Sequence, residues 1–246
     1  MKQLKELKDI KKIHFVGIGG AGMSPLAKVL VELGYEVSGS DRTDSDVIEK
    51  LRKLGAKITL GGQKAENVRG VDAIVVSTAI PYDNPEVLAA RDLGIMKLHR
   101  SDINAALVNQ YKGIAVAGAH GKTTTTSMLG VVLTKAGISP TVVVGGEVPD
   151  LGTNALLGEG EYLTSEADES DGSFLKFYPK IAVITNIEDD HMDHYGNMEN
   201  IIKVSMFESA QSRYASGVVN LWDWLFLEDY RTVLIKELRN ESDSMK

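Results

Sequence analysis

Two short glycine-rich segments constrain the fold of this chain most strongly, because each lies between an apolar strand-like stretch and an apolar helix-like stretch. The first, Gly17 to Gly22, begins within IHFVGI, and the second, Gly118 to Gly121, follows GIAVA. Strand, glycine turn and helix in this order are typical of parallel sheets that are covered by helices. The sequence therefore predicts an α/β protein with two such units.

The remaining sequence continues this alternation of strands and helices. Strands are expected at residues 35–41, 56–60, 72–78, 141–146, 161–167 and 180–186, and helices at residues 23–34, 46–55, 84–94 and 101–112. We predict a first domain over residues 1–106 and a second over residues 107–246. In the second domain the acidic segments EADESD and NIEDDH follow expected strands. Open α/β sheets bind ligands at the carboxyl ends of their strands, so both segments are candidates for a site.

The first glycine segment fits the pattern G-x-G-x-x-G through Gly17, Gly19 and Gly22, with Gly20 between them, and Asp41 closes the next strand. Glycines let the backbone approach a diphosphate, and the following helix presents its positive N-terminus to it. Taken alone, the pattern favours a dinucleotide site of the NAD type. A UDP-sugar satisfies it equally well, and a tight turn without a ligand is the structural alternative.

The second glycine segment, Gly118-Ala119-His120-Gly121-Lys122-Thr123 followed by Thr124, resembles the phosphate-loop pattern G-x-x-x-x-G-K-[ST]. Val116 stands where that pattern has its first glycine. Backbone N–H groups of such a loop surround phosphates, Lys122 can neutralise charge between the β- and γ-phosphates, and the Thr123 hydroxyl can ligate Mg²⁺. A glycine turn with a solvated lysine is the alternative.

Acidic and histidine side chains gather in the two segments that follow. The candidates are Glu166, Asp168, Glu169 and Asp171 in the first, and Glu188, Asp189, Asp190, His191, Asp193 and His194 in the second. Acidic runs usually lie on solvated loops, but ATP chemistry requires a divalent ion, and Mg²⁺ prefers oxygen ligands. Imidazole is more compatible with Mn²⁺ and other transition metals. His14 and His99 are expected to be structural, and His120 is open to either role.

Composition excludes several classes of function. With 27 basic and 34 acidic residues, the chain has no excess of positive charge to hold nucleic acid or an anionic membrane. The absence of cysteine excludes disulfides, thiolate catalysis and zinc–thiolate sites. The first twelve residues lack a continuous apolar segment, and no stretch reaches the length of a membrane span. We therefore expect a cytoplasmic protein without a signal peptide.

The combination of GIGGAGMS, AGAHGKTTTT, EADESDGSF and TNIEDDHMDHYG, between about Lys12 and Lys203, resembles the Mur ligases of peptidoglycan synthesis. The resemblance implies a Rossmann-like, parallel-sheet domain that holds the UDP part of a sugar nucleotide, followed by a P-loop-type α/β domain that binds ATP and metal. Residues 17–22 would then embrace the UDP diphosphate. Lys122 and Thr123 carry over as phosphate and Mg²⁺ contacts, Glu166 as a metal-binding glutamate, and His191 as the histidine that ligates a second divalent ion.

The reaction implied by the resemblance joins L-alanine to UDP-N-acetylmuramate. The ATP γ-phosphoryl group passes to the lactyl carboxylate, the amine attacks the resulting acyl phosphate, and phosphate leaves. Positioning and neutralisation of phosphate charge are the main tasks of such a site, which agrees with the absence of cysteine and of a serine-elbow motif. ATP and Mg²⁺ or Mn²⁺ are the implied cofactors.

After Lys203 the family's pattern is no longer recognisable. A strand at residues 217–222 and an amphipathic helix at residues 227–240 are expected in this part, which contains Trp222 and Trp224. The remaining central strands and the third domain of the family have no counterpart, so the second domain is expected to be truncated. The sequence thus leaves open an active ligase, an inactive nucleotide-binding fragment and, less favoured, an NAD-dependent oxidoreductase.

Overall fold

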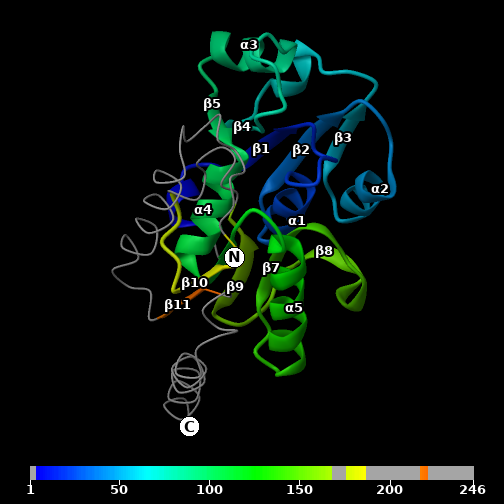
Figure 1. Cartoon of the computed structure of the whole chain (residues 1–246). Helices are drawn as coiled ribbons and strands as arrows, with labels where there is room; N and C mark the ends of the chain where they lie inside the picture. The colour runs from blue at the N-terminus through cyan, green and yellow to red at the C-terminus, as the bar shows by residue number, and fades with distance from the viewer. Residues whose placement is uncertain (1–3, 168–175, 187–216, 221–246) are drawn as a thin grey trace.

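The computed structural model describes residues 4–167, 176–186 and 217–220, which form two β-sheets with helices against them (Figure 1). The first sheet has the strand order β3-β2-β1-β4-β5, and all of its pairings are parallel. Its strands are β1 (Lys12–Val16), β2 (Glu36–Asp41), β3 (Lys57–Leu60), β4 (Ala73–Val76) and β5 (Met96–His99). Its helices are α1 (Ser24–Glu32), α2 (Asp46–Lys53) and α3 (Pro85–Asp92), with 3-10 turns η1 (Lys5–Leu7) and η2 (Ala65–Val68).

The second sheet is mixed, with the strand order β11-β10-β6-β9-β7-β8. Its strands are β6 (Lys112–Ala117), β7 (Thr141–Val148), β8 (Thr153–Leu156), β9 (Tyr162–Glu166), β10 (Ile181–Ile184) and β11 (Gly217–Asn220). Helix α4 (Arg100–Gln110) leads into this sheet, α5 (Lys122–Lys135) follows β6, and the 3-10 turn η3 (Pro149–Leu151) joins β7 to β8. Only β8 runs antiparallel to its neighbour among the described pairings.

The predicted α/β class is confirmed, and each expected helix and strand up to residue 186 is present. The strand expected at residues 217–222 is described for Gly217–Asn220, where it pairs with β10. The helix expected at residues 227–240 lies outside the described residues. Strand β8 was not predicted, because a four-residue antiparallel return after a 3-10 turn has no periodicity that local sequence could reveal. The predicted domain boundary at residues 106 and 107 falls within α4 and stays a prediction.

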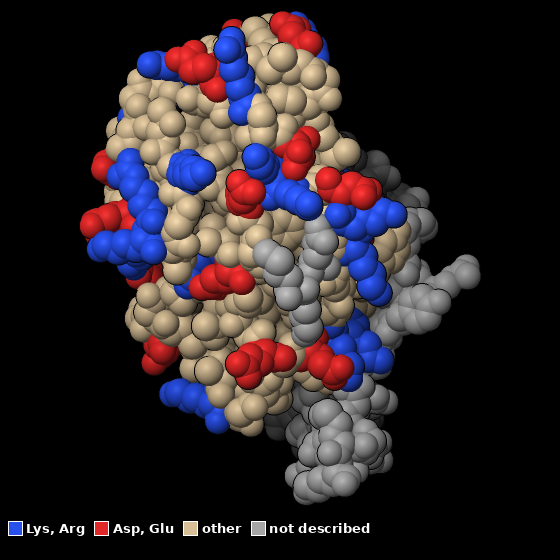
Figure 2. All heavy atoms as spheres, turned by 180° about the vertical axis from the view of Figure 1, so that it is seen from behind, with Lys and Arg blue, Asp and Glu red and all other residues tan. Residues whose placement is uncertain are grey.

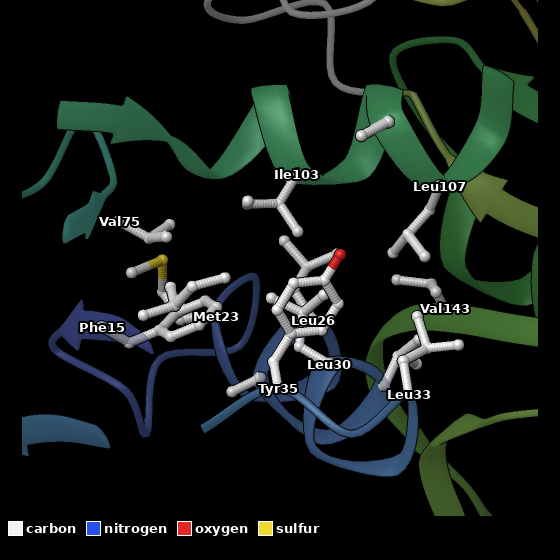
Figure 3. Close-up of a cluster of buried hydrophobic side chains, with 14 of the residues drawn as sticks. Phe15, Met23, Leu26, Leu30, Leu33, Tyr35, Val75, Ile103, Leu107 and Val143 are labelled. Atoms are coloured by element: carbon white, nitrogen blue, oxygen red, sulfur yellow. The ribbon is translucent and has the colours of Figure 1, made fainter. Parts of the chain in front are cut away.

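Helix α1 lies at the centre of a hydrophobic core that contains residues from both sheets. Figure 3 shows Leu26 and Leu30 of this helix and its C-cap residue Leu33 facing α4 and Val143 of β7, with Phe15 of β1 at the other end. All of these side chains are buried. Burial of a large aliphatic or aromatic side chain contributes about 1.5–3 kcal/mol, so this shared core fixes α1 against both sheets.

Polar contacts from α1 complete the junction with the second sheet. The Lys28 Nζ donates to Thr153 Oγ1 at 2.8 Å and to the Ala155 carbonyl at 2.6 Å, while Asn154 Nδ2 donates to Ser24 Oγ at 3.0 Å. Partial burial lowers the pKa of Lys28, and the nearby Glu32 carboxylate opposes that effect. These contacts attach β8 to the helix whose first turn adjoins the first glycine segment.

The surface mixes charges of both signs. Figure 2, seen from behind relative to Figure 1, shows Lys and Arg side chains interspersed with Asp and Glu side chains over that face. Among the helices that the structure describes, none combines the length and the apolar character needed to cross a bilayer.

A buried carboxylate, Glu86 at the start of α3, ties the elements of the first sheet together. It accepts hydrogen bonds from Ser40 Oγ at 2.7 Å and Asn67 Nδ2 at 2.6 Å, and its Oε1 lies 3.5 Å from His14 Nε2. Burial raises the pKa of the Glu86 carboxyl, but the contacts with His14, Asn67 and Ser40 outweigh it, so the pKa lies below its ordinary value. The ionised form is therefore part of the folded structure.

Replacement Glu86→Gln is expected to lower the free energy of unfolding at pH 7 by about 1–3 kcal/mol, because a charged acceptor is lost from a buried network. A lowered folded-state pKa stabilises the protein above the unfolded pKa of about 4.3, and this contribution is lost as the pH falls through the folded value. The difference between wild type and variant should therefore shrink below about pH 4. Denaturant unfolding at several pH values measures it, with the exposed Glu36→Gln as control. An equal effect of both variants would contradict the prediction.

Candidate functional site

The first glycine segment connects β1 to α1 at the carboxyl edge of the first sheet. Gly17 has a φ of +77°, a conformation that favours glycine, and the N–H groups of Gly17 and Ile18 both donate to the Ser40 carbonyl at the end of β2. In the strand order β3-β2-β1-β4-β5 the chain changes direction beside β1, which is the position where such sheets bind ligands. The predicted residues Gly17, Gly19, Gly20 and Gly22 therefore lie together at the expected edge.

Asp41 supports this segment through its carboxylate. Its Oδ2 accepts the Gly19 N–H at 2.8 Å, and its Oδ1 accepts the Arg42 N–H at 2.7 Å. A Cβ on Gly19 would lie 2.9 Å from that same Oδ2 and 3.1 Å from the Ile48 side chain. A side chain at this position would therefore displace the Asp41 carboxylate or the Ile48 side chain.

A crevice of about 770 Å³ opens over the segment and contains all five residues predicted for the first site. Its wall includes Arg100, the first residue of α4, whose Nη1 would lie 3.0 Å from a Cβ on Gly22. Sequence reasoning missed Arg100, although its position directly after β5 at the carboxyl edge was a usable signal. Its lining also includes Gly145 and Glu166 from the second sheet. The crevice therefore joins the two sheets.

The second glycine segment connects β6 to α5. Gly118 and Gly121 have φ values of +128° and +83°, and Gly121 is the N-cap of α5, so the loop turns at two glycines before the helix begins. Lys122 Nζ donates to the carbonyls of Gly118 at 2.5 Å and Ala119 at 3.2 Å. The lysine ammonium therefore lies over the loop, at a helix N-terminus that favours anions.

Residues at the end of β10 hold the second glycine segment from one side. Asn186 Oδ1 accepts the His120 N–H at 3.0 Å, and Asn186 Nδ2 donates to the His120 carbonyl at 2.9 Å. The Thr185 hydroxyl lies 2.6 Å from the His120 carbonyl and 3.1 Å from the Ala117 carbonyl. The residues TNIEDDH were expected only to bind metal, so this supporting role of Thr185 and Asn186 was not predicted.

Glu166 connects the two glycine segments. It ends β9, where it pairs with Val116 of β6, and its Oε2 accepts the Thr123 hydroxyl at 3.1 Å while its Oε1 accepts the Gly145 N–H at 2.9 Å. The same residue lines the crevice over the first segment. The oxygen atoms of Thr123 and Glu166 are the ligand type that Mg²⁺ prefers, so the pair fits a divalent ion beside the phosphate loop.

The other predicted ligands are not placed by the structure. His191 lies outside the described residues, as do Asp168, Glu169, Asp171 and the acidic residues after Asn186. Within the described ranges no group of three or more His, Asp or Glu side chains comes together. Thr124 is exposed in the first turn of α5.

The histidines expected to be structural do have structural contacts. His14 is buried in β1, with its Nδ1 3.0 Å from Ser38 Oγ. His99 is the N-cap of α4, where its N–H donates to Asp102 Oδ2 at 2.7 Å. His120 lies in the second glycine segment, and its backbone N–H and carbonyl both bond to the Asn186 side chain.

Comparison with protein families gives two matches that follow one another along the chain. Residues 12–112 match the family described as "Mur ligase family, catalytic domain", and residues 116–236 match the "Mur ligase middle domain". The second match continues beyond Lys203, where the recognisable motifs end.

Individual proteins show the same similarity. The UDP-N-acetylmuramate–L-alanine ligase of Desulforamulus reducens is 55% identical over 194 residues, which are 78% of this chain and 42% of that protein. The ligase of the same name from Burkholderia pseudomallei is 52% identical over 216 residues, or 87% of this chain and 46% of that protein. The chain thus spans less than half the length of these relatives.

Two solved structures resemble the chain closely. The UDP-N-acetylmuramate–alanine ligase from Thermotoga maritima has a TM-score of 0.77 at 35% identity, covering 85% of this chain and 48% of its own. The UDP-N-acetylmuramate:L-alanyl-gamma-D-glutamyl-meso-diaminopimelate ligase from Neisseria meningitides has a TM-score of 0.78 at 28% identity. The match covers 92% of this chain and 75% of that structure's chain.

Replacement Gly118→Ala is expected to destabilise the fold by more than about 2 kcal/mol, because it combines a φ of +128° with a Cβ that would overlap Thr185 Oγ1. The matched control is Gly137→Ala, which also has a positive φ but has no neighbouring atom within 4 Å of the added Cβ. Backbone conformation alone should cost this control about 1 kcal/mol. Denaturant unfolding compares the two, and equal losses would show that the contact with Thr185 is not what requires glycine.

Proposed function

The chain belongs to the Mur ligase family, and from this premise we propose that it contributes the UDP-sugar and ATP sites of a ligase that joins L-alanine to UDP-N-acetylmuramate. One observation carries the proposal. The carboxylate of Glu166 contacts the Thr123 hydroxyl of the second glycine segment and also lines the crevice over the first. A sugar nucleotide in that crevice and ATP on the phosphate loop would therefore meet at this residue.

The UDP diphosphate is proposed to lie against Gly17, Gly19, Gly20 and Gly22. The N-terminus of α1 follows this segment and carries the partial positive charge that favours phosphate. Arg100 supplies a guanidinium in the same crevice, and its planar fork suits phosphate or carboxylate oxygens. Asp41 would act on the site indirectly, because it holds the Gly19 backbone.

ATP is proposed to bind residues Gly118 to Thr124. The ammonium of Lys122 would leave the loop carbonyls for the β- and γ-phosphates and offset their charge. Thr123 and Glu166 would hold Mg²⁺, or Mn²⁺, which supplies neutralisation of phosphate charge when it is bound. The family resemblance assigns His191 to a second divalent ion.

The proposed chemistry is phosphoryl transfer followed by amide formation. The γ-phosphoryl group of ATP passes to the lactyl carboxylate, ADP leaves, and the L-alanine amine then attacks the acyl carbon and releases phosphate. The described residues would orient two anionic substrates and offset their repulsion, which are the main contributions that a protein makes to phosphoryl transfer. Because both nucleotides are intracellular metabolites, a cytoplasmic location is part of the proposal.

A second candidate function is binding of both nucleotides without ligation. The observation that favours it is that the chain spans less than half the length of the two UDP-N-acetylmuramate–L-alanine ligases from Desulforamulus reducens and Burkholderia pseudomallei. An NAD-dependent oxidoreductase is less favoured, because it would leave the second glycine segment without a role. Binding and turnover are therefore tested separately.

Replacement Lys122→Ala is expected to weaken Mg²⁺-ATP binding by about tenfold or more, since charge-assisted hydrogen bonds to phosphate are lost. Affinity for UDP-N-acetylmuramate should stay within about twofold of wild type. Isothermal calorimetry measures both. Lys135→Ala, at the exposed far end of the same helix, is the control and should change neither affinity.

The reciprocal variant is Arg100→Ala, which should weaken UDP-N-acetylmuramate binding by about tenfold and leave ATP binding unchanged. The exposed Arg91→Ala serves as its control. Loss of both affinities in either variant would contradict the assignment of two separate nucleotide sites.

Turnover is tested with ATP, Mg²⁺, UDP-N-acetylmuramate and L-alanine. A ligase should release phosphate only when all components are present, and Lys122→Ala should abolish the release. Phosphate release that does not depend on L-alanine would contradict the proposed reaction. Binding of both nucleotides without phosphate release would favour the second candidate function.

A further inference from the structure

The second glycine segment contains two glycines, where no side chain restricts the backbone, and Lys122 bonds to two of its carbonyls. Gly118 and Gly121 both adopt positive φ values, and glycine loses more conformational freedom on folding than any other residue. A phosphate loop nevertheless binds anions through backbone N–H groups that must converge on one point. Such a loop requires support from outside its own sequence.

The support in this chain comes from Thr185 and Asn186, which directly follow β10. Strand β10 is the parallel neighbour of β6, with Ile184 opposite Ala117, so Thr185 and Gly118 continue the two strands side by side. The Thr185 N–H donates to the Ala117 carbonyl at 2.9 Å. A Cβ on Gly118 would overlap the Thr185 hydroxyl, so the absence of a side chain at residue 118 is what allows Thr185 to lie against the loop.

Asn186 then holds the next turn of the loop at two points. Its side-chain amide accepts from the His120 N–H and donates to the His120 carbonyl. It thus makes the two backbone hydrogen bonds that a residue of a neighbouring strand would make in a sheet. The Thr185 hydroxyl lies against that same carbonyl. Thr185 itself is buried, which restricts the rotation of its side chain.

The bonds to Asn186 also determine which N–H groups of the loop are available to bind phosphate. The His120 N–H points to Asn186. The N–H groups that can converge on phosphate are then chiefly those of Gly121, Lys122 and Thr123, where α5 begins and its dipole favours an anion.

We propose that Thr185 and Asn186 are positioning residues that hold the backbone of His120, and so keep the phosphate loop in the shape that receives ATP. The inference rests on the proposed function only in naming ATP as the ligand of this loop. It assigns to both residues a role distinct from metal binding.

The test variant is Asn186→Asp, which keeps the size of the side chain and one acceptor but places a carboxylate oxygen against the His120 carbonyl. Affinity for Mg²⁺-ATP, measured by calorimetry on the whole chain, should fall by about tenfold or more. UDP-N-acetylmuramate affinity should stay within about twofold. Thr185→Val, which removes the hydroxyl, should also weaken ATP binding. Thr185→Ser, which keeps the hydroxyl, should bind ATP as tightly as wild type.

Asn109→Asp is the matched control, because Asn109 makes the same kind of two-point backbone contact elsewhere. Its Nδ2 donates to the Lys176 carbonyl at 3.1 Å, and its Oδ1 accepts the Tyr178 N–H at 2.7 Å. This variant should leave ATP affinity unchanged. Equal losses in both variants, or wild-type ATP affinity in Asn186→Asp, would overturn the proposal.

Amide hydrogen exchange, followed by NMR, separates this inference from the proposed function. Exchange at His120 should be faster in Asn186→Ala, which removes the acceptor of the His120 N–H, than in wild type or Asn109→Ala, with or without ATP. If the wild-type chain binds no ATP, the proposed function fails, and exchange alone decides whether the two residues hold the loop. Unchanged exchange at His120 would overturn the inference in either case.

Discussion

Packing of helix α1 against both sheets sets the relative position of the two glycine segments. Its apolar face shares one core with α4 and β7 (Figure 3). In addition, Lys28 donates a hydrogen bond to Thr153 of β8, and Ser24 accepts one from Asn154 of β8. The first turn of the same helix follows the first glycine segment. Any shift of α1 would therefore move the first glycine segment relative to Gly145 and Glu166, which line the same crevice.

Parallel pairing explains why residues distant in sequence meet at one edge. Val116 pairs with Glu166, and Ala117 pairs with Ile184, so the ends of β9 and β10 lie on either side of the loop that follows β6. One neighbour then supplies a carboxylate to Thr123, and the other supplies an amide to His120. The chemistry of the site thus follows from strand order and register, which bring residues from the ends of two neighbouring strands to the same loop.

The sequence predicted the elements and the two glycine segments well, because strand–turn–helix periodicity and glycine requirements are local properties. It also selected Glu166 and Thr123, which the structure brings together at 3.1 Å. Arg100 was missed although it could have been found from its position directly after β5, whereas Thr185 and Asn186 were missed as parts of the site because their roles depend on which strands become neighbours. Strand β8 was missed for the same reason, since its pairing with β7 has no local signal. The role of His191 stays a prediction.

Both glycine segments are held by a side chain from the end of a neighbouring strand, but the two supports differ in charge. Asp41 at the end of β2 accepts the Gly19 N–H, whereas Asn186 after β10 both accepts from and donates to His120. A carboxylate offers only acceptors, while an amide can hold an N–H and a carbonyl together. A neutral amide also adds no negative charge beside the loop proposed to take the triphosphate, which carries more negative charge than a diphosphate. The difference between the two supports therefore matches the difference between the proposed ligands.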